Sequence, residues 1–132
     1  MRKAPMRKFC VILTAALAAC AGGPVSIRQA MASCARGAPR VEVLVSGVVA
    51  RTLGSYSSRS GTHEGFLLST GGLTVRIENN TTITGPIPLV EGEAVSLQGQ
   101  YECNDGVIHW THRDPRLRHI GGFIEAGGKT YR

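Results

Sequence analysis

The chain has 132 residues, of which 42% are hydrophobic and 18% charged, and its formal net charge is +6. Once a leader is removed, we expect this length to form one small domain. Four basic residues lie in the first eight positions, and without them 11 Lys and Arg face 9 Asp and Glu, a net charge of +2. The high pI therefore gives little support to nucleic-acid binding.

The first 19 residues have the features of a signal peptide. A basic start precedes the apolar run Phe9 to Ala19, which is too short to span a bilayer as a stable helix. The run ends in Leu17-Ala18-Ala19-Cys20, which resembles a bacterial lipobox. We therefore expect cleavage before Cys20, a lipid on its thiol, and attachment to a membrane. The product would be a lipoprotein of the bacterial cell envelope, periplasm-facing or in the outer membrane.

Ordinary secretion is the alternative for this leader. Cleavage after Ala30-Met31-Ala32 would give a soluble periplasmic protein, but it would leave Arg28 between the apolar run and the cleavage site. Cleavage before Cys20 leaves residues 20–40, which are rich in Ala, Gly and Pro and lack a sustained hydrophobic period. We predict a flexible, lipid-anchored tether there. The chain thus divides into a signal peptide (1–19), a tether (20–40) and a domain (41–132).

Two cysteines remain unassigned once the leader and the lipid are accounted for. Cys10 leaves with the signal peptide and Cys20 carries the lipid, so Cys34 and Cys103 are left as a pair. In an oxidising envelope compartment an even pair indicates a disulfide, and two unrelated thiols are the alternative. The bridge would close a loop of about seventy residues and stabilise the domain by roughly 4 kcal/mol in the chain-entropy model.

From residue 41 the hydrophobic pattern has a period of two, which is typical of half-buried strands. We predict five principal strands, at residues 41–49, 63–69, 73–78, 95–103 and 106–110. Gly71-Gly72 and Asn104-Asp105-Gly106 fit hairpin connections, and Gly47 and Gly99 fit sharp bends within strands. This pattern predicts an all-β fold, a five- to six-stranded OB-like barrel, with an antiparallel sandwich as the alternative.

The stretch 106–115, GVIHWTHRDP, contains the chemically most versatile side chains. Residues three apart in a strand point to opposite sides, so His109 and His112 cannot share a metal unless the strand ends near Trp110. The Asp114-Pro115 pair favours such a turn, after which His63 could approach His112. We name His63 and His112 as candidate metal ligands, although the spacing matches no zinc signature.

Three functions are compatible with this stretch. A binding or interaction module would use Trp110 as an aromatic platform, ringed by His63, His112, Arg113 and Asp114. A histidine-based or metal-dependent hydrolase would use an imidazole as general base and arginines to hold an anionic substrate, but no nucleophile lies in a G-x-S-x-G motif. A purely structural envelope protein is the third interpretation.

The binding module is the leading hypothesis, with the ligand and any cofactor left open. Six aromatic residues after the leader and a modest net charge argue against single-stranded nucleic acid as the ligand. We predict that Trp110 shares the inward, buried face with Ile108, that His112 turns toward His63, and that His109 lies on the other face with Val107.

Residues 63–69 and 106–131 resemble a family of small bacterial proteins, the domain-of-unknown-function family 3465. The His-Trp-Thr-His-x-Asp-Pro block is the distinctive part of that pattern. The matching residues are His63, His109, Trp110, Thr111, His112, Asp114, Pro115, Gly121, Gly122, Lys129 and Tyr131. The resemblance implies a shared fold and a shared site, but no reaction. This chain has Asn79-Asn80-Thr81-Thr82 where the family has His-Asn-Ile-Asp, and the family pattern carries a tryptophan near the position of Cys103.

Overall fold

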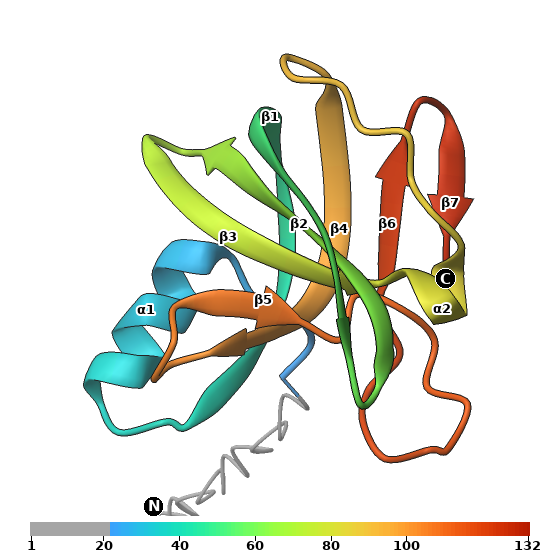
Figure 1. Ribbon diagram of the computed structural model, residues 1–132. Coiled ribbons are helices and arrows are strands. Elements are labelled where there is room, and N and C mark those ends of the chain that lie inside the picture. The colour runs from blue at the N-terminus through green and yellow to red at the C-terminus, as the bar shows by residue number, and fades with distance from the viewer. Residues whose placement is uncertain (1–21) are drawn as a thin grey trace, which may run out of the picture.

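The computed structural model describes residues 22–132, so the predicted signal peptide and Cys20, the predicted site of lipidation, lie outside the described residues. Figure 1 shows a barrel of strands with one helix against its side. The elements are α1 (Ile27–Ala35), β1 (Arg40–Ser58), β2 (Gly61–Thr70), β3 (Leu73–Asn80), α2 (Thr81–Thr84), β4 (Ala94–Glu102), β5 (Val107–His109), β6 (Phe123–Ala126) and β7 (Lys129–Tyr131). Within residues 22–132, neither helix has the length and apolar character needed to cross a membrane.

The strands form one sheet in the order β1-β2-β3-β5-β4-β6-β7, and β1 also pairs with β4. This extra pairing closes a ring through β1, β2, β3, β5 and β4, in which only the β3–β5 pair is parallel. The predicted all-β, OB-like barrel is confirmed. The sheet has seven strands rather than five or six because a hairpin of β6 and β7 extends it from the edge of β4.

Two glycines let the backbones approach one another where the barrel closes. The first half of β1 pairs with β4 and the second half with β2, and Gly47 lies near the change of partner. A Cβ on Gly47 would lie 2.2 Å from the carbonyl oxygen of Ser69, and one on Gly99 would lie 2.6 Å from that of His109. Both positions require glycine because no Cβ fits these contacts, and the sharp bends predicted at the two residues stay a prediction.

The interior of the barrel is filled from alternating strand positions, as a period of two predicts. On β4, Val95, Leu97 and Tyr101 are buried, and the polar residues between them are half-buried. Phe66 and Ile108 are fully buried from other strands. Burying each such side chain stabilises the fold by about 1.5–3 kcal/mol. This core is complete without Trp110, which lies outside it.

The segment before the barrel is a helix packed against it, so the prediction of a flexible tether over residues 20–40 is wrong from Val25 onward. Val25 bridges to β1, and Ser26 begins α1 with a capping box that includes Gln29. Ile27 and Ala30 are buried against the barrel. Ile27, Ala30 and Cys34 are spaced as i, i+3 and i+7, a helical period that extends over only nine residues. The capping box is a second sequence signal for the start of this helix.

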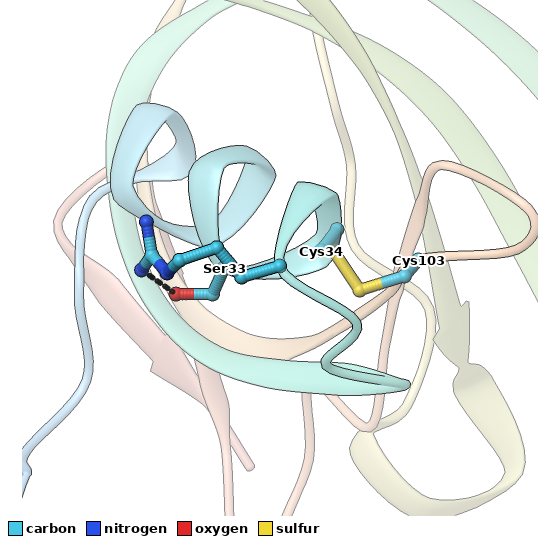
Figure 2. The surroundings of a disulfide bond; sticks show 4 residues. Ser33, Cys34 and Cys103 are labelled. Atoms are coloured by element: carbon cyan, nitrogen blue, oxygen red, sulfur yellow. Dashed lines mark hydrogen bonds between the residues drawn. A yellow bond between two sulfur atoms is a disulfide. The ribbon is translucent and has the colours of Figure 1, made fainter.

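The predicted Cys34–Cys103 disulfide is present and holds α1 to the barrel. Cys34 lies in the last turn of α1 and Cys103 directly after β4, as Figure 2 shows. Their Cα atoms are 5.5 Å apart, within the range of ordinary disulfides. Both cysteines pack against the hydrophobic core. The covalent bond therefore joins two segments that also contact each other through apolar side chains.

Candidate functional site

One pocket collects all four histidines of the chain, His63, His109, His112 and His119. Its volume is about 770 Å³. The walls come from the β1–β2 hairpin, the end of β3 with α2, and the loop between β5 and β6. In Figure 1 the hairpin and this loop project from the same, lower end of the barrel. Residues distant in sequence thus meet because the barrel brings two of its connections together.

His63 forms one wall of the pocket from β2. It pairs across the sheet with Tyr56 of β1, and the two rings stack with centroids 5.3 Å apart and planes inclined by 15°. The Nε2 atom of His63 is hydrogen-bonded to the hydroxyl of Ser60 at 2.9 Å. Burial lowers the pKa of His63, and the nearby Glu78 carboxylate offsets part of this shift. Burial therefore favours the neutral form of His63, and in the tautomer with hydrogen on Nδ1 its Nε2 accepts a hydrogen bond from the serine hydroxyl.

The opposite wall begins where β5 ends, and the predicted orientation of Trp110 is wrong. Trp110 has a left-handed φ of 57° and is 38% exposed, whereas Thr111 and His112 are 0% and 4% exposed. The strand stops at His109, so its alternation no longer applies to the tryptophan. The indole instead lies 4.4 Å from the ring of His119, at the pocket wall. Ile108 remains inward, as predicted.

His112 and His119 are held in the same tautomer. The Nδ1 atom of His112 donates to the carbonyl of Arg113 at 2.6 Å, and that of His119 donates to the carbonyl of Ile120 at 2.7 Å. A carbonyl oxygen only accepts, so each Nδ1 carries hydrogen, and the neutral form of such a ring has its acceptor at Nε2. Burial lowers the pKa of His112. The two rings meet edge to face, 5.3 Å between centroids.

The two candidate metal ligands lie in the same pocket, but the described residues do not form a preformed metal site. His63 and His112, the two candidate ligands, both line the pocket. Within residues 22–132, however, no three His, Cys, Asp or Glu side chains are grouped so that they could hold a metal ion. His109, predicted to lie apart on the other strand face, also lines the pocket because the pocket wraps around the end of β5.

Asp114 shapes the loop between β5 and β6. Its carboxylate accepts backbone N–H groups from Arg116, Arg118 and His119. Burial opposes ionisation of Asp114, but these hydrogen bonds bring its pKa below the ordinary value. Asp114 lines the pocket, as expected for a site residue, but its oxygens are occupied by the loop itself. Arg113 is exposed and does not line the pocket.

The arginines of the pocket are ones that sequence reasoning did not single out. They are Arg59, Arg116 and Arg118. Nothing in the pattern around them distinguished them from a solvated basic face, because their position depends on how the hairpin and the loop approach one another. Asn80 and Thr82, at the positions of the departure from the family pattern, also line the pocket.

Glu78 is a second pocket residue that the sequence did not reveal. It alternates with apolar residues on β3 and was expected on the polar face, but it is only 5% exposed. One oxygen, Oε1, accepts from Arg76 Nε at 2.6 Å. The other, Oε2, is buried and has no hydrogen-bond partner among residues 22–132. Glu78 therefore adds a buried carboxylate to the lining of the pocket, and one of its oxygens has no hydrogen-bond partner among the described residues.

Comparison with known proteins places the chain in a family. No curated protein and no solved structure shows significant similarity to it. The sequence model of one family, described as "Protein of unknown function (DUF3465)", matches residues 12–132. This match includes α1, the whole barrel and every residue of the pocket. On that match, the chain belongs to the DUF3465 family.

Proposed function

We propose that the domain is a ligand-binding module whose pocket takes a small organic anion with a planar group. The observation that carries this proposal is the convergence of all four histidines, Trp110 and three arginines on one pocket. Its volume, about 770 Å³, lies within the range of small-molecule sites. Side chains so diverse, brought from separate connections to one cavity, are what ligand recognition needs.

The chemistry of the pocket defines the ligand. Arg59, Arg116 and Arg118 supply positive charge for a phosphate or carboxylate group. Trp110 is partly exposed and offers a face for a planar ring. Glu78 lines the pocket, and a rotation of its side chain toward the cavity would let the oxygen that lacks a protein partner accept a hydroxyl or amine hydrogen from the ligand. A ligand with an anionic group, a planar body and a donor satisfies all three features.

Trp110 provides the readout, because it is the chain's single tryptophan. We expect phenyl phosphate to quench its fluorescence saturably, and inorganic phosphate or phenol to bind more weakly. Arg116→Ala with Arg118→Ala should weaken binding by roughly tenfold or more, since a hydrogen bond to a charged group contributes about 1.5 kcal/mol. Arg51→Ala, an exposed arginine outside the pocket, is the matched control. Equal affinity in the double variant and the wild type would refute the proposed site.

A hydrolase is the second candidate, and the contact between Ser60 and His63 favours it. At 2.9 Å the neutral imidazole can accept the serine proton as Oγ attacks an ester carbonyl carbon. The C–O bond to the leaving group then breaks, and His63 returns the proton to the leaving alcohol. Water hydrolyses the resulting acyl-serine with His63 again as base. Arg59, next to Ser60, would attract an anionic substrate.

Turnover separates these two functions. The hydrolase predicts release of p-nitrophenol from p-nitrophenyl acetate, lost in Ser60→Ala and retained in Ser57→Ala, a nearby serine outside the pocket. Binding of phenyl phosphate should survive in Ser60→Ala. If the wild-type chain hydrolyses the ester no faster than buffer, the Ser60–His63 contact is structural and only the binding function stands.

We also propose that the protein is an envelope lipoprotein. The disulfide supports an oxidising compartment. The alternative cleavage after Ala32 would cut α1 and remove the buried Ile27 and Ala30, which favours cleavage before Cys20. Metabolic labelling with a fatty-acid analogue should mark the protein, and Cys20→Ala should abolish the label. An unlabelled mature chain that starts at Ser33 would show ordinary secretion instead.

A further inference from the structure

We propose that the tip of the loop between β5 and β6, residues 113–120, docks on an anionic lipid surface. Leu117 is 92% exposed and Ile120 is 59% exposed, although both are large aliphatic side chains. They lie close together in sequence, in a loop that projects from the barrel (Figure 1). Neither residue lines the pocket, so ligand binding there does not account for their exposure.

The charges around these two side chains match a lipid headgroup layer. Arg113, Arg116 and Arg118 are all exposed in the same tip. The acidic residue of the tip, Asp114, has only 5% of its side chain exposed, and it accepts hydrogen bonds from the loop backbone. The surface therefore presents cations beside aliphatic groups and hides its carboxylate. Basic and apolar side chains together are the combination that binds anionic membrane interfaces.

The conformation of the tip is also suited to a partly dehydrated interface. Asp114 satisfies three backbone N–H groups, of residues 116, 118 and 119. Backbone donors without a partner are costly where water is scarce, so this arrangement removes part of the cost of approaching lipid. Leu117 has a left-handed φ of 52°, which a leucine rarely adopts. The loop holds the side chain outward in spite of that strain.

The position of the tip in the domain favours a membrane over a protein partner. The segment that leads into α1, blue in Figure 1, enters the domain at the same lower end from which the tip projects. The described chain therefore begins at the end of the barrel that carries the tip. Two aliphatic side chains offer far less area than the roughly 800 Å² per partner of a stable protein interface. Shallow insertion between headgroups needs no such area.

Vesicle flotation with the full chain carrying Cys20→Ala tests the docking surface without a lipid anchor. We expect stronger partition into vesicles of phosphatidylcholine and phosphatidylglycerol than into pure phosphatidylcholine, and weaker partition at high salt. Leu117→Asp should lower the partition coefficient at least about tenfold, because a leucine side chain loses its apolar contact. Arg113→Gln should lower it about fivefold, the effect of one basic residue near an anionic surface.

Matched controls separate the tip from the rest of the chain. Val90→Asp changes another exposed aliphatic residue, 63% exposed in the α2–β4 connection, and should leave partition unchanged. Arg51→Gln is the control for charge. The leader is the same in every variant, so differences between them report on the tip alone. Circular dichroism checks that each variant is folded.

Two results would overturn the proposal: equal loss in Leu117→Asp and Val90→Asp, or equal partition into neutral and anionic vesicles. Absence of binding to either kind of vesicle would overturn it as well. Phenyl phosphate binding should be unchanged in Leu117→Asp, since this residue lies outside the pocket. The docking surface and the ligand-binding function can therefore fail separately.

Discussion

Opening the Cys34–Cys103 disulfide should lower the free energy of unfolding by roughly 4 kcal/mol. The two cysteines are 69 residues apart, and the entropy that the unfolded chain regains when such a loop opens accounts for this value. The native state should keep α1 docked after reduction, because Ile27 and Ala30 stay buried and Val25 stays bridged to β1. For a domain of about this size, the loss corresponds to a fall in Tm of roughly 15 °C.

The assay is guanidinium and thermal unfolding of the oxidised and the reduced chain, with reduction verified by alkylation. The double variant Cys34→Ser with Cys103→Ser should match the reduced chain and should not respond to reductant. A complete reduction that costs less than about 1 kcal/mol would refute the loop-entropy reasoning. Loss of hydrogen-exchange protection in α1 alone, with unchanged barrel unfolding, would show that the bond anchors the helix and does not stabilise the barrel.

Three further changes test the backbone, the indole and the histidines. Gly122→Ala should cost about 2 kcal/mol in denaturant unfolding, since its Cβ would lie 2.3 Å from the carbonyl oxygen of Trp110, whereas Gly121→Ala meets nothing within 3.8 Å and should be tolerated. Trp110→Ala should cost only about 1 kcal/mol, far less than a buried tryptophan, because its side chain is partly exposed. Acidification from pH 7.5 to 5 should lower Tm, because the pKa values of His63 and His112 are depressed below 6.5 in the folded chain, so the unfolded chain takes up protons first. Buried carboxyls with raised pKa act in the opposite direction, so the decisive comparison is with His112→Gln, which should show the smaller pH dependence.

The sequence predicted the strands in which apolar and polar side chains alternate over many residues. Alternation over eight or nine residues leaves a clear period, which is why the principal strands and the barrel were predictable. The hairpin of β6 and β7 was not predicted because its strands have four and three residues, too few to show alternation. Its turn, Gly127-Gly128, was readable, and both glycines have positive φ. α1 was not predicted because the Ala, Gly and Pro content of residues 20–40 indicated a flexible segment. The capping box formed by Ser26 and Gln29 was the contrary signal.

The site was less predictable, because it depends on where strands end and which connections meet. The sequence indicated a turn near Trp110, but one left-handed φ decided that the indole faces the pocket and Thr111 the core. The contact between Ser60 and His63 is local, three residues apart across a hairpin turn, and could have been sought there. The burial of Glu78 had no such signal, since the hairpin and loop that cover it are distant in sequence.

Asp114 connects the pocket to the proposed docking surface. Its two oxygens accept three N–H groups of the loop, and this loop carries both the pocket residues Arg116 and Arg118 and the exposed Leu117. Asp114→Asn replaces one oxygen with an amide donor that faces backbone donors, so the loop should lose its conformation. The barrel should melt almost as before, because the Asp114 carboxylate accepts hydrogen bonds only from the loop. We therefore expect phenyl phosphate binding and vesicle partition to fall together in Asp114→Asn. Arg59→Ala should weaken phenyl phosphate binding and leave vesicle partition unchanged. If either property survives in Asp114→Asn, the two surfaces do not share a common support.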